Sequence, residues 1–188
     1  MSDAPLRLNL GCGAQKLDGF IGVDKYGEPD VRHDLEQLPW PWADSSVAAV
    51  KMIHVLEHLG QDPKVFIGIM KELYRVCAPG ARIEIVVPHP RHDYFLGDPT
   101  HVRPITYQVM SLFDRELCLE WQAKGIASTP LALYHGVDFK VTKVLQVPDQ
   151  PYLAMLVEKR ITPDEMVQFE RSRNNVIAEI RLELEVRK

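Results

Sequence analysis

The sequence has little of several features that would place it quickly in a class. Its three cysteines are odd in number and form no C-x-x-C pair, so we expect neither a disulfide framework nor a zinc knuckle, and a reducing cytoplasm fits best. No apolar run approaches the roughly 18 residues of a membrane span, and the first residues lack the basic start and apolar core of a signal peptide. With 22 Lys and Arg against 26 Asp and Glu, no basic excess indicates a nucleic-acid partner.

What the chain does have is the composition of an ordinary globular domain. It contains 188 residues, of which 46% are hydrophobic and 26% charged. Apolar segments at 6–10, 20–24, 31–35, 47–55 and 82–87 each end in Gly, Pro, Asp or a turn cluster, as strands do. Before the last of them, Asp62 and Pro63 begin a helix with one apolar stripe, which ends before Gly80. Near-continuous apolar strands alternating with helices predict the α/β class with a parallel sheet.

The second half of the chain is less regular. Residues 88–101 form a polar, proline-broken loop that carries several histidines, and helices are expected over 106–112 and 115–124. The apolar segments 139–147 and 152–157 look like a closing β-hairpin. We therefore expect one domain over 1–160. A capping box at Thr162 then predicts a helical tail over 161–188, which packs on that domain or contacts a second copy in a homodimer. Within it Leu182, Leu184 and Val186 alternate with charged residues and would also suit a strand, but we favour the helix.

Glycine and acidic residues stand where the first two strands end. Gly11 and Gly13 follow the first strand, where an open α/β sheet usually binds its ligand, and Asp24 ends the second, where a carboxylate can accept both ribose hydrogens. A nicotinamide dinucleotide is disfavoured because Lys16 replaces the third glycine of its fingerprint. The interval from Gly13 to Asp24 is also too short for a full crossover helix. S-adenosylmethionine contains adenosine without needing a phosphate cradle, and it fits this pattern best.

Residues 6–113 contain an ordered set of short motifs. They are LNLGCG at 8–13, GVD at 22–24, HDL at 33–35, LP at 38–39 with DSSV at 44–47, HVLEH at 54–58, ELYRVCAPG at 72–80 and VVP at 86–88. In order and spacing this set resembles the class I S-adenosylmethionine-dependent methyltransferases, in particular small bacterial members with an LNLGCG start. The resemblance implies a Rossmann-like, mostly parallel seven-stranded sheet with an antiparallel last strand and helices on both faces.

The same resemblance assigns cofactor-binding roles to eight positions. Gly11 and Gly13 would hold the amino-acid and ribose region of the cofactor, and Asp24 would accept from the ribose hydroxyls. Asp34 would accept from the adenine amino group, the Leu35 backbone would donate to a ring nitrogen, and His54 would lie near the reactive methyl. An asparagine stands where many relatives carry an acid, so it would meet the cofactor's ammonium group through its amide oxygen. These positions are Asn9, Gly11, Cys12, Gly13, Asp24, Asp34, Leu35 and His54.

The loop after the fifth strand is expected to supply the catalytic groups. An imidazole suits a general base at neutral pH, and the DPTH element recurs in the relatives, so we name His101 as base, Asp98 as its orienting partner and His92 as reserve. No metal site is assigned. The same side chains could ligate a metal, but that reading ranks third, behind a general base and behind a purely structural loop. Glu57 supports the loop beneath the site or acts in the site itself.

The expected reaction is O-methylation of a small molecule or a saccharide, the latter implied by the family resemblance. Aromatic side chains after the fifth strand would build the acceptor pocket. Two other functions stay open: a noncatalytic interaction module that keeps the cofactor fold, and a nicotinamide oxidoreductase. The candidate pocket residues are Tyr94, Phe95, Tyr107 and Phe113.

Overall fold

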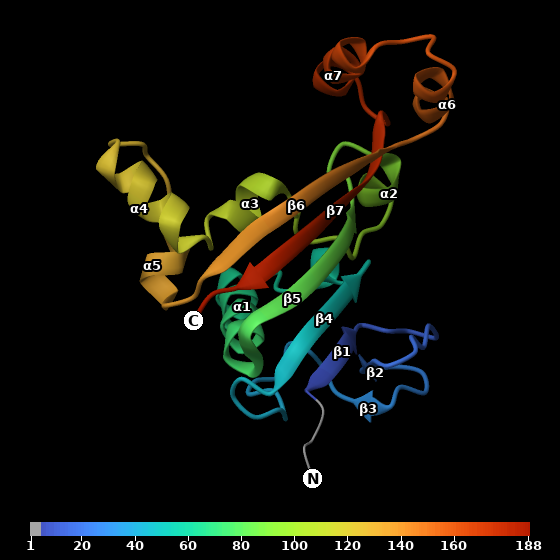
Figure 1. Cartoon of the computed structure of the whole chain (residues 1–188). Helices are drawn as coiled ribbons and strands as arrows, with labels where there is room; N and C mark the ends of the chain where they lie inside the picture. The colour runs from blue at the N-terminus through green and yellow to red at the C-terminus, as the bar shows by residue number, and fades with distance from the viewer. Residues whose placement is uncertain (1–4) are drawn as a thin grey trace.

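The computed structural model describes residues 5–188, and its centre is one seven-stranded sheet (Figure 1). The strand order is β3-β2-β1-β4-β5-β7-β6. The strands are β1 (Leu6–Leu10), β2 (Ile21–Asp24), β3 (Val31–Arg32), β4 (Val47–Ile53), β5 (Cys77–Pro88), β6 (Phe139–Pro148) and β7 (Ile177–Val186).

The sheet is mostly parallel, as expected. Strands β1 to β5 pair in parallel, whereas β7 runs antiparallel to both β5 and β6. The carboxyl ends of the five parallel strands therefore meet at one edge, where loops can gather around a ligand. The α/β class and the Rossmann-like sheet are confirmed.

The helix α1 (Pro63–Val76) covers one face of the sheet. It begins where expected, because the Asp62 side chain accepts from the Lys64 amide (2.8 Å) and Pro63 takes the first turn. Its buried side chains Phe66, Ile69 and Leu73 join the main core. The aliphatic side chains of β1, β4, β5 and β7 that share this core are Leu8, Leu10, Val50, Met52, Ile83, Ile85, Leu182 and Leu184.

The helices are unequally distributed around the sheet. Residues 11–20, which connect β1 to β2, form turns only. On the face away from α1 the strands carry charged side chains, among them the ion pairs Lys51 with Glu84 (2.7 Å) and Lys143 with Glu183 (2.9 Å). The short first connection thus leaves this face polar and solvated.

The remaining helices are short. The expected helices after the histidine-containing loop are present as α3 (Tyr107–Ser111) and α4 (Arg115–Ala123). The others are the 3-10 helix η1 (Leu56–His58), α2 (Asp93–Leu96), α5 (Leu131–His135), α6 (Tyr152–Val157) and α7 (Pro163–Ser172). No described helix is long and apolar enough to cross a membrane.

Two expectations for the end of the chain were wrong. Segment 152–157 is the helix α6, so the hairpin partner of β6 is β7. The capping box at Thr162 does begin the helix α7, but 177–186 forms a strand within the sheet. Residues 161–188 are therefore no separate helical tail. Buried aliphatic residues alternate with charged ones along β7, and this period of two suits a strand whose one face joins the core.

The helices α6 and α7 extend beyond the ends of β6 and β7 (Figure 1). They enclose a small apolar cluster of their own, separate from the main core. Its buried members are Ile161, Met166, Val176 and Ile177.

Candidate functional site

The loop after β1 is fixed to β2 by its own backbone. The Gly11 amide donates to the Val23 carbonyl (2.8 Å), and the Gly13 amide donates to Asp24 Oδ2 (2.8 Å). Gly11 has φ +67°, and a Cβ there would lie 2.2 Å from Val55 Cγ2. Only glycine fits this position, because both the left-handed backbone and the neighbouring valine exclude a side chain.

Two adjoining hollows open at the carboxyl ends of the parallel strands, and Gly11 lines both. Together they are lined by all eight positions expected to bind the cofactor. The first hollow contains Asp24, Asp34 and Leu35, whereas the second, of ≈ 310 Å³, contains Asn9, Cys12, Gly13 and His54. The structure therefore brings together residues from four separate loops.

The two carboxylates of the first hollow are held by backbone amides. Asp24 accepts from Gly13 and, through Oδ1, from the Tyr26 amide (2.9 Å). Asp34 accepts from the Glu36 amide (3.1 Å) and lies 3.5 Å from Lys25 Nζ. A carboxylate has about four acceptor sites, so each retains capacity for a ligand hydroxyl or amino group.

Two further residues contribute at or behind this hollow. Trp40 is buried behind it, and its indole Nε1 donates to the Leu35 carbonyl (3.0 Å). It thus holds the backbone at Leu35. His33 lines the same hollow, and its Nε2 is buried without a protein partner. The HDL motif contained His33, yet nothing in the sequence indicated that its imidazole would lie here.

At the second hollow, Asn9 and Cys12 are buried beneath the loop. The Asn9 amide donates to the Gln15 carbonyl (3.0 Å), which leaves its oxygen as the free acceptor. Burial and the nearby Asp24 raise the pKa of the Cys12 thiol, so it stays protonated and neutral.

His54 lies at the mouth of the second hollow, with φ +52°. Its Nε2 lies 3.1 Å from Glu179 Oε1, and its Nδ1 lies 3.6 Å from Glu57 Oε1. Glu57 first, and Glu179 after it, raise the pKa of His54. Glu179 was not predicted as a site residue, because it belongs to β7, a segment that was expected to be a helix.

His92 occupies a structural position. It is 3% exposed, its Nδ1 accepts from the Tyr94 amide (3.0 Å), and its Nε2 lies 2.9 Å from Asp149 Oδ2. Both ring nitrogens are therefore occupied, one in capping α2 and the other in binding the end of β6. The structure does not offer His92 as a free base.

His101 keeps one free nitrogen, but Asp98 is not its direct hydrogen-bond partner. His101 Nδ1 lies 3.0 Å from the Phe95 carbonyl, whereas Nε2 lies 3.8 Å from Asp98 Oδ2. Asp98 instead accepts from the Thr100 amide (2.8 Å) and hydroxyl (2.6 Å), and these bonds lower its pKa. The Phe95 carbonyl orients the imidazole, and the Phe95 ring stacks on it.

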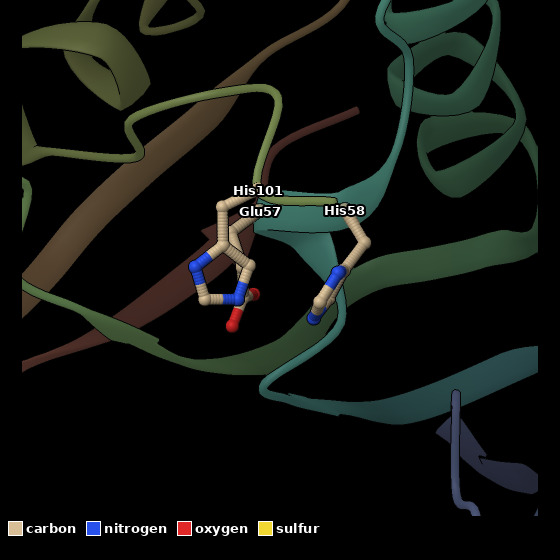
Figure 2. A group of neighbouring side chains, drawn as sticks. All are labelled: Glu57, His58 and His101. Atoms are coloured by element: carbon tan, nitrogen blue, oxygen red, sulfur yellow. The ribbon is translucent and has the colours of Figure 1, made fainter. Parts of the chain in front are cut away.

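Glu57 and His58 lie beside His101, so the structure unites three potential ligands (Figure 2). One ligand atom from each side chain lies within 4.8 Å of the others. The Glu57 side chain is buried, and neither carboxylate oxygen has a hydrogen-bond partner within the described chain. From the sequence, loop support and a site role were both open for Glu57, and nothing indicated a role for His58.

The aromatic residues proposed for the acceptor pocket separate into two groups. Tyr94 is 63% exposed and Tyr107 41% exposed, whereas Phe113 is fully buried in the core against Phe66 and Phe139. Phe113 therefore supports the fold and cannot line an acceptor pocket. Phe95 remains beside His101.

Solved structures with a similar fold cover nearly the whole chain. An S-adenosylmethionine-dependent methyltransferase from Archaeoglobus fulgidus is 18% identical with a TM-score of 0.57, over 96% of this chain and 86% of that protein. The [4+2]-cyclase SpnF is 15% identical with a TM-score of 0.52, over 99% and 77%.

A third similar structure is the 1,6-didemethyltoxoflavin-N1-methyltransferase of Burkholderia thailandensis, with bound 1,6-didemethyltoxoflavin and S-adenosylhomocysteine. It is 13% identical with a TM-score of 0.52, over 97% of this chain and 71% of that protein. No family model matches the sequence, and no curated protein matches it significantly. On sheet order and structural similarity, the chain has the class I S-adenosylmethionine-dependent methyltransferase fold.

Proposed function

We propose that the protein is an S-adenosylmethionine-dependent methyltransferase that acts on a hydroxyl group of a small molecule or saccharide. One observation carries the proposal: residues from four loops, matched in advance to cofactor-binding roles, line two adjoining hollows at the edge where this sheet class binds ligands. The bound S-adenosylhomocysteine of the Burkholderia enzyme, which shares the fold, supports the same ligand chemistry.

Different residues would bind different parts of the cofactor. Asp24 would accept from the ribose hydroxyls, while Asp34 and the Leu35 backbone would bind the adenine, with Trp40 holding the Leu35 carbonyl. The Asn9 oxygen and the glycine loop would hold the methionine end. When bound, the cofactor supplies a methyl group on a positively charged sulfur, so the protein's main task is alignment.

On the acceptor side, His101 is the group suited to take up a proton. Its Nδ1 can only donate to the Phe95 carbonyl, so Nε2 carries the lone pair. An acceptor hydroxyl that gives its proton to this nitrogen becomes a better nucleophile for the methyl group. Asp98 would act on His101 indirectly, since it fixes Thr100 in the turn before His101.

Calorimetric titration tests the cofactor site. The wild-type protein should bind S-adenosylmethionine and S-adenosylhomocysteine but not NAD. In Asp24→Asn, the weakened bonds to two ribose hydroxyls should reduce affinity by ~100-fold, because hydrogen bonds to charged groups are worth about 1.5–3 kcal/mol each. The matched control is Asp18→Ala, an exposed carboxylate in the same connection. Absence of adenosyl-ligand binding by folded wild-type protein would contradict the proposal.

Turnover needs its own assay, because the [4+2]-cyclase shows that the fold also serves other reactions. Transfer of a radiolabelled methyl group to a panel of phenols, small alcohols and saccharides should occur with the wild type. It should fall by about 100-fold or more in His101→Ala, the range typical of a lost general base. Cofactor binding without transfer to any hydroxyl acceptor would favour the noncatalytic module.

A further inference from the structure

The Glu57 carboxylate lies in a costly environment. It is 0% exposed, and its nearest charged neighbour in the described chain is His54, at 3.6 Å, beyond hydrogen-bond distance. No described Lys or Arg side chain lies within 4 Å of it. An ionised carboxylate is buried at such cost only where it is paired or coordinates a metal ion.

The hydrogen bonds of His58 fix its tautomer. Its Nδ1 lies 2.9 Å from Thr100 Oγ1, and the Thr100 hydroxyl donates its single hydrogen to Asp98 Oδ1 (2.6 Å). Thr100 Oγ1 can therefore only accept from His58, so Nδ1 carries the hydrogen. The lone pair of His58 is left on Nε2.

His101 has the same tautomer as His58, but a different contact fixes it. A backbone carbonyl is purely an acceptor, so the contact with Phe95 places the hydrogen on Nδ1 and the lone pair on Nε2. The two rings lie 4.5 Å apart between centroids, next to the Glu57 carboxylate (Figure 2). Histidines that bind metals almost always donate the other ring hydrogen to a carbonyl or another acceptor in this way.

We propose that Glu57, His58 and His101 bind one divalent transition-metal ion of the zinc or manganese type. Two imidazoles with one carboxylate suit Zn²⁺, Fe²⁺ or Mn²⁺ better than Mg²⁺ or Ca²⁺, which prefer oxygen ligands. Three protein ligands leave a coordination position open, as in catalytic rather than structural metal sites.

The open coordination position of the ion would lie next to the proposed cofactor site. Glu57 lies 3.6 Å from His54, which lines the second hollow, so the ion would adjoin the methionine end of the cofactor site. This step depends on the proposed methyltransferase function: an acceptor oxygen bound to the ion would be positioned beside the methyl group and made more acidic. With its Nε2 lone pair on the ion, His101 would then act as a ligand in place of a direct base.

Titration of tag-free, EDTA-treated protein with ZnCl₂, MnCl₂ or MgCl₂ tests the site. We expect one Zn²⁺ or Mn²⁺ per chain and no comparable Mg²⁺ binding. Glu57→Gln and His58→Ala should each weaken binding by at least about 100-fold, and Thr100→Val, which removes only the acceptor for His58, by about 10-fold. His135→Ala, a histidine on α5, is the control and should bind like the wild type.

Two results would overturn the proposal: a wild type that binds neither Zn²⁺ nor Mn²⁺ at one ion per chain, or a His58→Ala variant that binds like the wild type. S-adenosylhomocysteine titration of the same samples separates this site from the cofactor site. Asp24→Asn should lose the adenosyl ligand and keep the metal ion, whereas His58→Ala should lose the ion and keep the ligand. Failure of one site is thus measured independently of the other.

Discussion

The proposed cofactor side, around the loop after β1, and the proposed acceptor side, around the loop after β5, are held together by different kinds of contact. On the cofactor side, backbone amides bind nearby carbonyls and carboxylates: Gly11 donates to Val23, and Gly13 to Asp24. On the acceptor side, side chains join segments that are distant in sequence. The pairs are His92 with Asp149 and Asp93 with Asn175.

The two kinds of contact tolerate substitution differently. A loop fixed by its backbone needs glycine at one position and an acceptor at another, and leaves the other side chains free. A site fixed by side chains depends on each of them, because removing one partner leaves the other without its hydrogen bond. Substitutions on the proposed acceptor side should therefore act locally.

The largest effect is expected from the glycine loop. Gly11→Ala places a Cβ 2.2 Å from Val55 Cγ2 in a left-handed backbone, so both overpacking and strain oppose it. We expect a loss of about 3 kcal/mol in the free energy of unfolding, with loss of adenosyl-ligand binding. Urea unfolding and calorimetry measure the two quantities.

Gly13→Ala is the matched comparison in the same loop. Gly13 has φ +52° but no atom within 4 Å of an added Cβ, so only the strain of about 1 kcal/mol remains. Equal destabilisation by the two alanines would show that backbone conformation, and not the contact with Val55, restricts the loop.

The cofactor side was predictable from the sequence because its signals are local. Gly11, Gly13 and Asp24 each stand at the end of an apolar strand, and strand ends of a parallel sheet share one edge. The capping box at Thr162 was equally local, and the helix it predicts is present. Such signals act within a few residues and need no knowledge of the tertiary fold.

The acceptor side was not predictable because its partners meet only after folding. Glu57 and His101 are 44 positions apart in the printed sequence, and their contact depends on where two loops lie. The strand β7 was assigned to a helix, although its alternation suited a strand, because apolar residues also continue at helical spacing past α7. In the structure α7 ends at Ser172, and Asn175, with φ +57°, lies between it and β7.

The second largest effect is expected at His92. His92→Ala removes the partner of Asp149 and the cap of α2, so the segment containing α6 and α7 should open more readily. A loss of about 2 kcal/mol corresponds to roughly 30-fold faster amide exchange there. Exchange measured by mass spectrometry should leave α1 unchanged. Equal acceleration in α1 would mean that His92 supports the whole fold.

A smaller effect of opposite sign is expected at Glu57. With EDTA present, Glu57→Gln replaces a buried carboxylate that has no hydrogen-bond partner in the described chain with a neutral amide, so the variant should be more stable than the wild type by about 1 kcal/mol. Zn²⁺ should reverse the order, because only the wild type gains stability from binding the ion. Thermal unfolding with EDTA and with Zn²⁺ measures both. A variant less stable under both conditions would show that the carboxylate serves packing.

The smallest effect is the acid sensitivity of the contact between His92 and Asp149. The hydrogen bond from His92 lowers the pKa of Asp149, so the carboxylate stabilises the fold above its unfolded pKa of about 3.9. That contribution is lost as pH falls through the lower, folded-state value. The stability difference between the wild type and Asp149→Asn should therefore be constant near neutrality and shrink below about pH 4. Urea unfolding of both proteins across this range measures the difference, and one that stays unchanged into acid would show that the bond needs no charge on Asp149.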